Sequence, residues 1–188
     1  MGSNKEFVNT LEDVIGKRGA MDKLVSDSAQ VEISARVKNI LRNLLIDDWQ
    51  SEPHFQWQNF AERRWKHLKK YTQWYMNHRN VPPNAWLLCL RWVADVMNHT
   101  AERSLGWQPP LQVLTGQKVD ISVILCFLSW DVVYVTRYKD KSYSRQVGSS
   151  KSDEIRGRFV GFAWDVGHAL TFLVLTDDTQ KVIPRSRV

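Results

Sequence analysis

The sequence predicts a mixed α/β protein of the α+β kind, with helices before Lys118 and short strands after it. Several segments before Lys118 carry apolar residues at the spacing of amphipathic helices. After Lys118 the chain turns to short runs rich in valine, isoleucine and phenylalanine, separated by turn residues, which is typical of strands. We therefore expect a helix-rich domain over residues 1–118 and a small β-rich domain over residues 119–188.

The composition indicates a folded, basic protein. Its 188 residues are 43% hydrophobic and 24% charged, which is typical of globular chains. The net charge of +6 and the pI near 9.4 favour a polyanionic partner, although many basic proteins bind no polyanion. Cys89 and Cys126 lie in apolar runs and are expected to be free thiols. No apolar run reaches the length of a membrane span, so we expect a nuclear or cytoplasmic protein that is neither secreted nor membrane-bound.

In the first sixty residues the spacing predicts two helices and two short extended segments. Residues 7–15 form a helix that ends near Gly16, and residues 21–26 form a short strand that ends at Asp27. The clearest helical stripe begins at Ile33 and runs to Leu45. Residues 46–49 follow as a short strand or connector, before a polar and aromatic loop.

The middle of the chain predicts two longer helices. The first runs from about residue 61 to residue 77 and stops before Pro82-Pro83. The second covers residues 84–103 and is apolar on most sides, so we expect it to be packed. Residues 111–114 can add one more helical turn.

The last third of the chain predicts strands around a basic loop. Residues 123–135 are rich in β-formers, and short strands are expected at 159–162, 170–175 and 181–183. The turn residues 177–179 join the last two strands as a hairpin. Between these segments, residues 139–156 are rich in serine, lysine and arginine, so we expect a mobile basic loop there.

Two carboxylates are candidates for a metal site. Asp27 ends the predicted strand, and Glu62 lies near the start of the basic helix, 34 residues further along. Carboxylates from separate rigid elements can hold divalent metal ions for phosphoryl chemistry. The alternative is structural, since a glutamate near a helix N-terminus interacts favourably with the helix dipole and caps the helix.

The helix that begins near Glu62 is a candidate DNA-binding surface. Lys66, Lys69 and Lys70 share one side with Glu62 at helical spacing, and Arg63 is adjacent. Cations in such a row can contact a phosphate backbone. The basic loop could track a backbone in the same way. The alternatives are an ordinary solvated helix face and a merely soluble loop. No serine or cysteine nucleophile motif and no glycine-rich phosphate loop occurs in the sequence.

Four segments of the sequence carry a family resemblance, and they occur in order along the chain. They are LVSDSA at 24–29, QNFAER at 58–63, SLGWQPPLQVLTG at 104–116, and the stretch from RGRFVG at 156–161 to KVIPRSRV at 181–188. In this order they resemble segments of the integrases of copia-type retrotransposons. In that family the first two segments carry the second catalytic aspartate and the final glutamate.

The resemblance implies a truncated ribonuclease-H-like integrase core, rich in helices, followed by a small β-barrel-like domain. It implies that Asp27 and Glu62 are the second and third carboxylates of an Asp-Asp-Glu triad that binds Mg²⁺ or Mn²⁺. It also implies that Lys66 and Lys69 occupy helix positions that contact element DNA ends in related retroviral enzymes. The implied partners are DNA, as element ends and target, and further copies of the chain.

The sequence also departs from the family pattern. The family's first catalytic aspartate lies on a strand far upstream, whereas 26 residues precede Asp27. The glycine expected after Asn59 is missing, which stiffens the loop before Glu62. We therefore expect a C-terminal portion of an integrase that binds nucleic acid but does not catalyse strand transfer alone. The alternative is a domesticated or structural protein-interaction module without DNA activity. A complete metal-dependent nuclease would need a further carboxylate from Asp47, Asp48 or Glu52.

Overall fold

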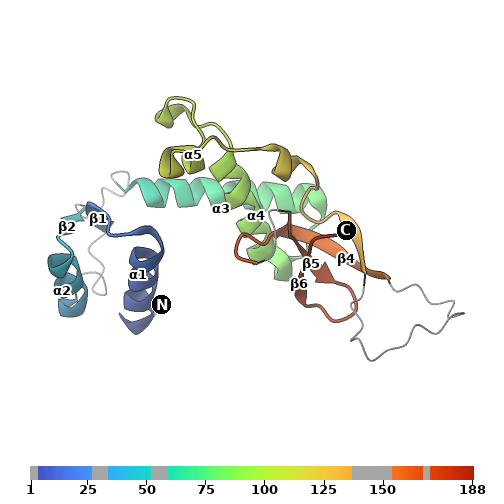
Figure 1. Cartoon of the computed structure of the whole chain (residues 1–188), viewed down its shortest axis with the longest axis horizontal. Coiled ribbons are helices and arrows are strands. Elements are labelled where there is room, and N and C mark those ends of the chain that lie inside the picture. The colour runs from blue at the N-terminus through green and yellow to red at the C-terminus, as the bar shows by residue number, and fades with distance from the viewer. Residues whose placement is uncertain (1–3, 27–33, 52–58, 137–153, 167–169) are drawn as a thin grey trace, which may run out of the picture. The chain divides into compact units, whose positions relative to one another are not determined.

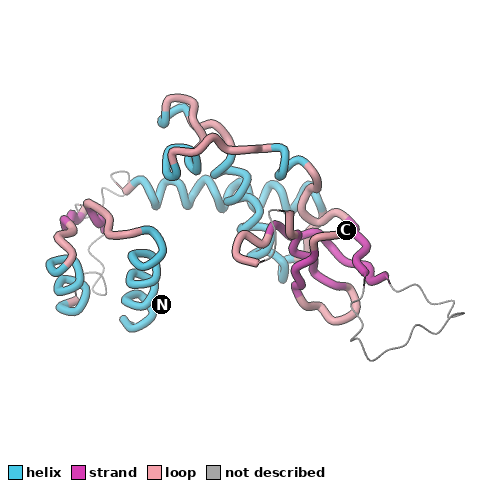
Figure 2. Tube along the Cα trace, in the orientation of Figure 1, coloured by secondary structure: helices cyan, strands magenta, loops and turns pink. Residues whose placement is uncertain are grey.

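The protein divides into two compact units, Met1–His67 and Leu68–Val188. The computed structural model describes residues 4–26, 34–51, 59–136, 154–166 and 170–188. Both units combine helices with strands (Figures 1 and 2), so the predicted mixed α+β class is confirmed. Over these described ranges, no helix is both long and apolar enough to cross a bilayer.

The first unit contains a two-stranded parallel sheet and an aliphatic core. α1 (Asn4–Arg18) is followed by β1 (Lys23–Ser26), α2 (Ala35–Asn43) and β2 (Asp47–Gln50). β1 pairs in parallel with β2 along its whole length, so that Ser26 lies opposite Gln50. The core is made by side chains of both helices and of the residue before β2, namely Val8, Leu11, Val37, Leu41 and Ile46. The helices and strands predicted for this region are confirmed, with small shifts of their ends.

A sharp reversal of the chain separates α3 (Phe60–Arg79) from the helices that follow it. α3 begins in the first unit and ends in the second. Asn80 then adopts the left-handed conformation with φ of 51°, and the Val81 N–H donates to the Met76 carbonyl at 3.0 Å. The 3₁₀ helix η2 (Pro83–Ala85) leads directly into α4 (Trp86–His99). Pro83 is the first residue of η2, and proline is favoured in the first turn of a helix. The helices η3 (Arg103–Leu105), α5 (Pro110–Thr115) and η4 (Ser122–Leu125) follow.

The second unit is built on a four-stranded antiparallel sheet. Its strands are β3 (Val132–Thr136), β4 (Glu154–Phe162), β5 (Phe172–Thr176) and β6 (Val182–Arg185), paired in chain order. Trp92 of α4 packs on this sheet with its ring centroid 5.4 Å from Phe159 and 5.9 Å from Phe162. Residues of α3 and α4 therefore share one hydrophobic core with the strands. Lys118, where the sequence indicates a domain boundary, lies within this unit.

Several details of the second unit differ from the sequence-based predictions. The described strands form an open sheet, not a closed barrel. Residues 122–125 form η4 instead of a strand, because the Asp120 carboxylate accepts hydrogen bonds from the Ser122 N–H (2.9 Å) and hydroxyl (2.7 Å). α4 ends at His99, four residues before the predicted end. β4 begins at Glu154, so the last residues of the predicted loop 139–156 are strand, while residues 139–153 lie outside the described residues.

Candidate functional site

The N-terminus of α3 explains the position of Glu62. The Asn59 side-chain oxygen accepts hydrogen bonds from the N–H groups of Ala61 (3.0 Å) and Glu62 (3.3 Å), so Asn59 caps the helix. Glu62 is thereby placed in the first turn, where a negative charge interacts favourably with the helix dipole. The Glu62 carboxylate also pairs with Lys66 at 3.8 Å, one turn along. The position of this residue is fully accounted for by local helix chemistry.

The other predicted carboxylate, Asp27, lies outside the described residues. The strand end before it is well anchored. Ser26 is buried at the end of β1, and its carbonyl oxygen accepts hydrogen bonds from the Ser51 N–H (2.9 Å) and hydroxyl (3.2 Å). The predicted strand ending at Asp27 is therefore confirmed up to Ser26. Whether Asp27 approaches Glu62 stays a prediction.

Of the two predicted metal ligands, only Glu62 lies among the described residues. Nowhere in the described ranges do three or more His, Cys, Asp or Glu side chains gather as a metal ion would require. Asp47 and Asp48 lie on β2 and are exposed, and Glu52 is outside the described residues. The Glu62 carboxylate has an ammonium group as its neighbour. Binding of Mg²⁺ or Mn²⁺ by Asp27 and Glu62 therefore stays a prediction, and we derive no chemical step from it.

The four predicted DNA-binding residues of α3 are Arg63, Lys66, Lys69 and Lys70, and all of them are exposed. The Arg63 guanidinium lies over the exposed ring of Phe60, 4.9 Å from its centroid. In the second unit, the side of α3 that carries Thr72 and Met76 is buried, and this fixes which side of the helix meets solvent. All four cations thus meet solvent, with Lys69 at the edge of the buried side, three residues before Thr72.

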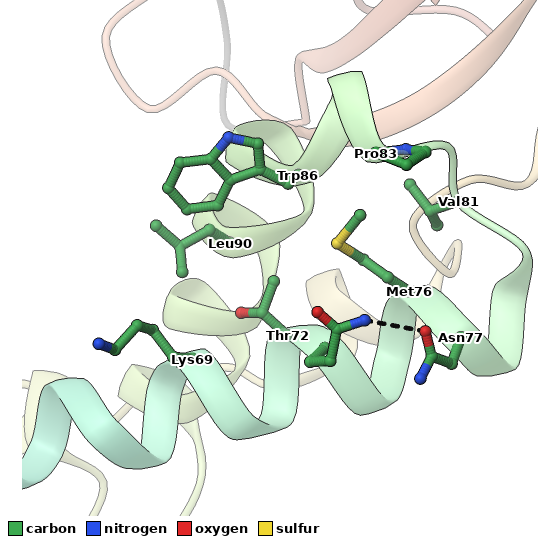
Figure 3. Close-up of a pocket in the computed structure, with 9 residues that line it drawn as sticks. Lys69, Thr72, Met76, Asn77, Val81, Pro83, Trp86 and Leu90 are labelled. Carbon is green, nitrogen blue, oxygen red and sulfur yellow. Dashed lines mark hydrogen bonds between the residues drawn. The ribbon is translucent and has the colours of Figure 1, made fainter.

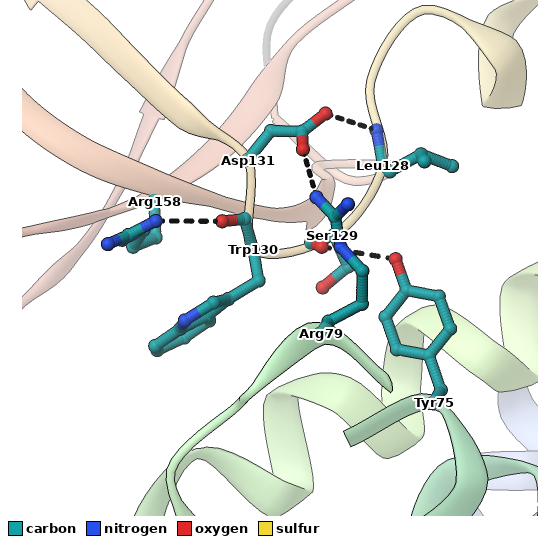
Figure 4. Close-up of polar contacts among 7 residues, drawn as sticks. All are labelled: Tyr75, Arg79, Leu128, Ser129, Trp130, Asp131 and Arg158. Carbon is teal, nitrogen blue, oxygen red and sulfur yellow. Dashed lines mark hydrogen bonds and ion pairs between the residues drawn. The ribbon is translucent and has the colours of Figure 1, made fainter. Parts of the chain in front are cut away.

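Arg79, the last cation of α3, has a structural role. Its guanidinium pairs with the Asp131 carboxylate, whose second oxygen accepts a hydrogen bond from the Leu128 N–H at 2.9 Å (Figure 4). One turn earlier, the Tyr75 hydroxyl donates to the Ser129 carbonyl at 3.1 Å. Burial raises the pKa of Tyr75, which keeps this donor protonated. These contacts attach the end of α3 to the segment that leads into β3.

Two arginines next to the predicted basic loop also have partners within the protein. Arg156 pairs with Asp177 at 3.6 Å. Arg158 donates to the Trp130 carbonyl at 3.1 Å, and its guanidinium lies 5.7 Å from the centre of the Trp130 ring (Figure 4). Both side chains project from β4, where they bind neighbouring elements. These arginines therefore contribute less to a nucleic-acid surface than their charge in the sequence indicates.

A pocket between α3 and α4 is absent from the sequence-based predictions. Its volume is about 370 Å³, and nine residues line it: Lys69, Thr72, Gln73, Met76, Asn77, Val81, Pro83, Trp86 and Leu90. Figure 3 shows Lys69, Thr72, Met76 and Asn77 projecting from α3, opposite Trp86 and Leu90 of α4, with Val81 and Pro83 at the connection. The sequence signal that could have indicated it is the tight Asn80–Pro83 reversal, which brings the two helices together.

A comparison with solved structures gives a distant likeness. No family model matches the sequence, and no curated protein matches it. The fold is similar to a chain in the cryo-EM structure of the simian T-cell lymphotropic virus intasome in complex with PP2A regulatory subunit B56 gamma. The identity is 16%, the TM-score is 0.48, and the match covers 98% of this chain and 63% of that chain. The chain thus spans less than two thirds of the matched chain, and the likeness concerns the backbone arrangement alone.

Proposed function

We propose that this chain binds nucleic acid through the exposed cations of α3, as a portion of an integrase of the copia type. The observation that carries the proposal is the exposed cationic side of α3. Arg63, Lys66, Lys69 and Lys70 are exposed along it, with Lys69 three residues before the buried Thr72, whereas Arg79 at the end of the helix is paired with Asp131. These four positions are one to three residues apart and span about two helical turns, so several side chains can contact one phosphate backbone together.

The electrostatics of the whole chain support this proposal. The net charge is +6, so the field around the protein attracts a polyanion from a distance. Within the row, Glu62 offsets part of the positive charge of Lys66, because its carboxylate lies 3.8 Å from the Lys66 ammonium. We expect binding to depend most on Lys69 and Lys70, which are adjacent and lie on the part of α3 that belongs to the second unit. Contacts of this kind bind phosphates without reading base sequence.

Fluorescence anisotropy with a labelled DNA duplex tests the proposal. The variant Lys69→Gln/Lys70→Gln should bind about tenfold more weakly at low salt, because two phosphate contacts are lost. The variant Lys118→Gln/Lys181→Gln removes two exposed lysines elsewhere and serves as the charge-matched control. Addition of EDTA should leave binding unchanged, because side-chain cations make these contacts. Equal weakening by both variants would contradict a site on α3.

A second candidate function is favoured by the exposed apolar side chains of the second unit. Large side chains including Trp74, Leu87 and Trp107 are more than half exposed. Such surfaces are typical of protein–protein contacts, as expected of a protein-interaction module without DNA activity. Sedimentation velocity distinguishes the two functions, since this module would self-associate or bind a protein partner while showing no salt-dependent DNA affinity.

A further inference from the structure

We propose that the pocket between α3 and α4 binds an unpaired nucleobase of a nucleic-acid strand whose backbone lies along the cations of α3. This inference rests on the proposed function and adds a second kind of contact to it. The pocket volume of about 370 Å³ falls within the range of about 300–1,000 Å³ that is usual for small-molecule sites. All nine lining residues belong to the second unit.

The wall formed by α4 offers a surface for stacking. Trp86, the first residue of α4, lines the pocket, and 47% of this residue is exposed. Figure 3 shows its indole next to Leu90 on the α4 side of the pocket. Leu90 and Met76 are buried and form an apolar floor beneath it. An indole that is open to solvent above an apolar floor suits a flat aromatic ring, and bases stack on tryptophan independently of their sequence.

The wall formed by α3 offers polar groups that match the edge of a base. Gln73 donates a hydrogen bond from Nε2 to Asn77 Oδ1 at 2.9 Å (Figure 3). This bond uses one donor of Gln73 and the acceptor of Asn77, so the same wall still carries the Gln73 Oε1 acceptor and the Asn77 Nδ2 donor. An amide acceptor and an amide donor on one wall can hydrogen-bond to the edge of a nucleobase. The pocket thus combines stacking with base-edge contacts.

The charge of the pocket agrees with a nucleotide occupant. Lys69 is the one charged residue among those that line it, and no carboxylate lines it. Lys69 is also a member of the cationic row of α3, so the row and the pocket meet at this side chain. A strand whose phosphates follow the row would reach the pocket at Lys69, with its next base beside Trp86.

The test uses the full chain and a single-stranded thymidine oligonucleotide that contains one 2-aminopurine. Stacking quenches the fluorescence of 2-aminopurine, so the wild-type protein should quench it on binding. Trp86→Ala should abolish this quenching and weaken binding about 5- to 100-fold, whereas Trp86→Phe should restore part of both. Trp74→Ala is the matched control, because Trp74 is an exposed tryptophan of α3 that stacks on His78 outside the pocket. It should leave the quenching unchanged.

Distinct outcomes separate the failure of this inference from the failure of the proposed function. If the strand binds with the expected salt dependence and the Trp86→Ala variant quenches 2-aminopurine as strongly as the wild type, base binding in the pocket is wrong. Phosphate binding by the cations of α3 would still hold. No binding of any strand at low salt would overturn both. If Trp86→Ala fails to fold, a second variant, Gln73→Leu/Asn77→Leu, changes two exposed residues of the opposite wall. It should also reduce the quenching of 2-aminopurine. Unchanged quenching in this variant would overturn the proposal. If an equal concentration of dAMP displaces the oligonucleotide, the pocket binds a free nucleotide. The proposal that its occupant is a base of a strand would then be wrong.

Discussion

The two units of the protein differ in what fills their cores. The first unit has five aliphatic side chains around a two-stranded parallel sheet. The second has Trp92, Phe159 and Phe162 in mutual contact above a four-stranded antiparallel sheet. Two strands with few neighbours are marginally stable, and parallel strands are usually covered on both faces. The comparison indicates that the second unit holds most of the stability of the chain and gives the proposed nucleic-acid surface a firm support.

The largest effect should follow from truncating the central side chain of the second unit. Trp92 is 1% exposed, so Trp92→Ala should lower the free energy of unfolding of this unit by about 3–5 kcal/mol. Trp74 is 64% exposed, and Trp74→Ala should change the free energy of unfolding by less than about 1 kcal/mol. Urea denaturation followed by circular dichroism measures both. Similar losses in the two variants would contradict the assigned core.

A core truncation in the first unit should act on that unit alone. Leu41 is buried between α1 and α2, and Leu41→Ala should cost about 2–4 kcal/mol. Because this unit has little stability to lose, its amides should lose their protection against hydrogen exchange, while those of β4 and β5 keep theirs. Leu45→Ala is the control, since Leu45 is exposed. Loss of protection in both units would show that they unfold together.

A smaller effect should follow from separating the end of α3 from the segment before β3. Arg79→Ala removes the partly exposed pair with Asp131 and should cost about 1 kcal/mol. Asp131→Ala should cost more, because it also removes the acceptor of the Leu128 N–H. A double-mutant cycle on the unfolding free energy isolates the pair. A coupling energy near zero would mean that the pair adds nothing to the attachment made by the Tyr75–Ser129 bond and the core packing of α3.

The smallest effect concerns the pH dependence of the second unit. Burial raises the pKa of Asp95, although the Trp164 indole, Arg91 and His99 act in the opposite direction. A carboxyl whose pKa is higher in the folded state favours folding below its unfolded pKa, and this stability is lost as the pH rises through the folded value. Asp95→Asn should therefore be slightly more stable than wild type at neutral pH, and the difference should vanish near about pH 3. Urea midpoints at both pH values test this; a less stable variant at neutral pH would contradict it.

The sequence was a good guide to elements whose cause is local. The helix predicted from the stripe at 33–45, the proline stop after α3 and the hairpin at residues 177–179 each depend on neighbouring residues. The helix is present over Ala35–Asn43, Ile33 lies outside the described residues, and the stop and the hairpin are present. The error at Ser122–Leu125 has a local cause as well, since the hydrogen bonds from Ser122 to the Asp120 carboxylate form a turn at the start of an apolar run with high β-propensity.

The parts of the site that the sequence did not reveal depend on distant partners. The sequence shows Arg79 as one more cation of the basic helix and does not reveal its partner. That partner, Asp131, lies 52 residues away in the chain. Trp86 belongs to a helix that is predicted to be apolar on most sides and packed, yet its side chain lines an open pocket because the chain reverses just before it. Pairings of this kind are set by tertiary packing, which no local spacing encodes.

The central claim is that Lys69 and Lys70 contact nucleic-acid phosphates. The most direct measurement is the salt dependence of DNA affinity for the wild-type chain and for Lys69→Gln/Lys70→Gln. Each phosphate contact contributes about 0.9 to the slope of log K against log salt on duplex DNA. The account predicts a slope that is smaller by about 1.8 in the double variant and unchanged in Lys118→Gln/Lys181→Gln. Identical slopes in all three proteins, or affinity that does not fall with salt, would contradict it.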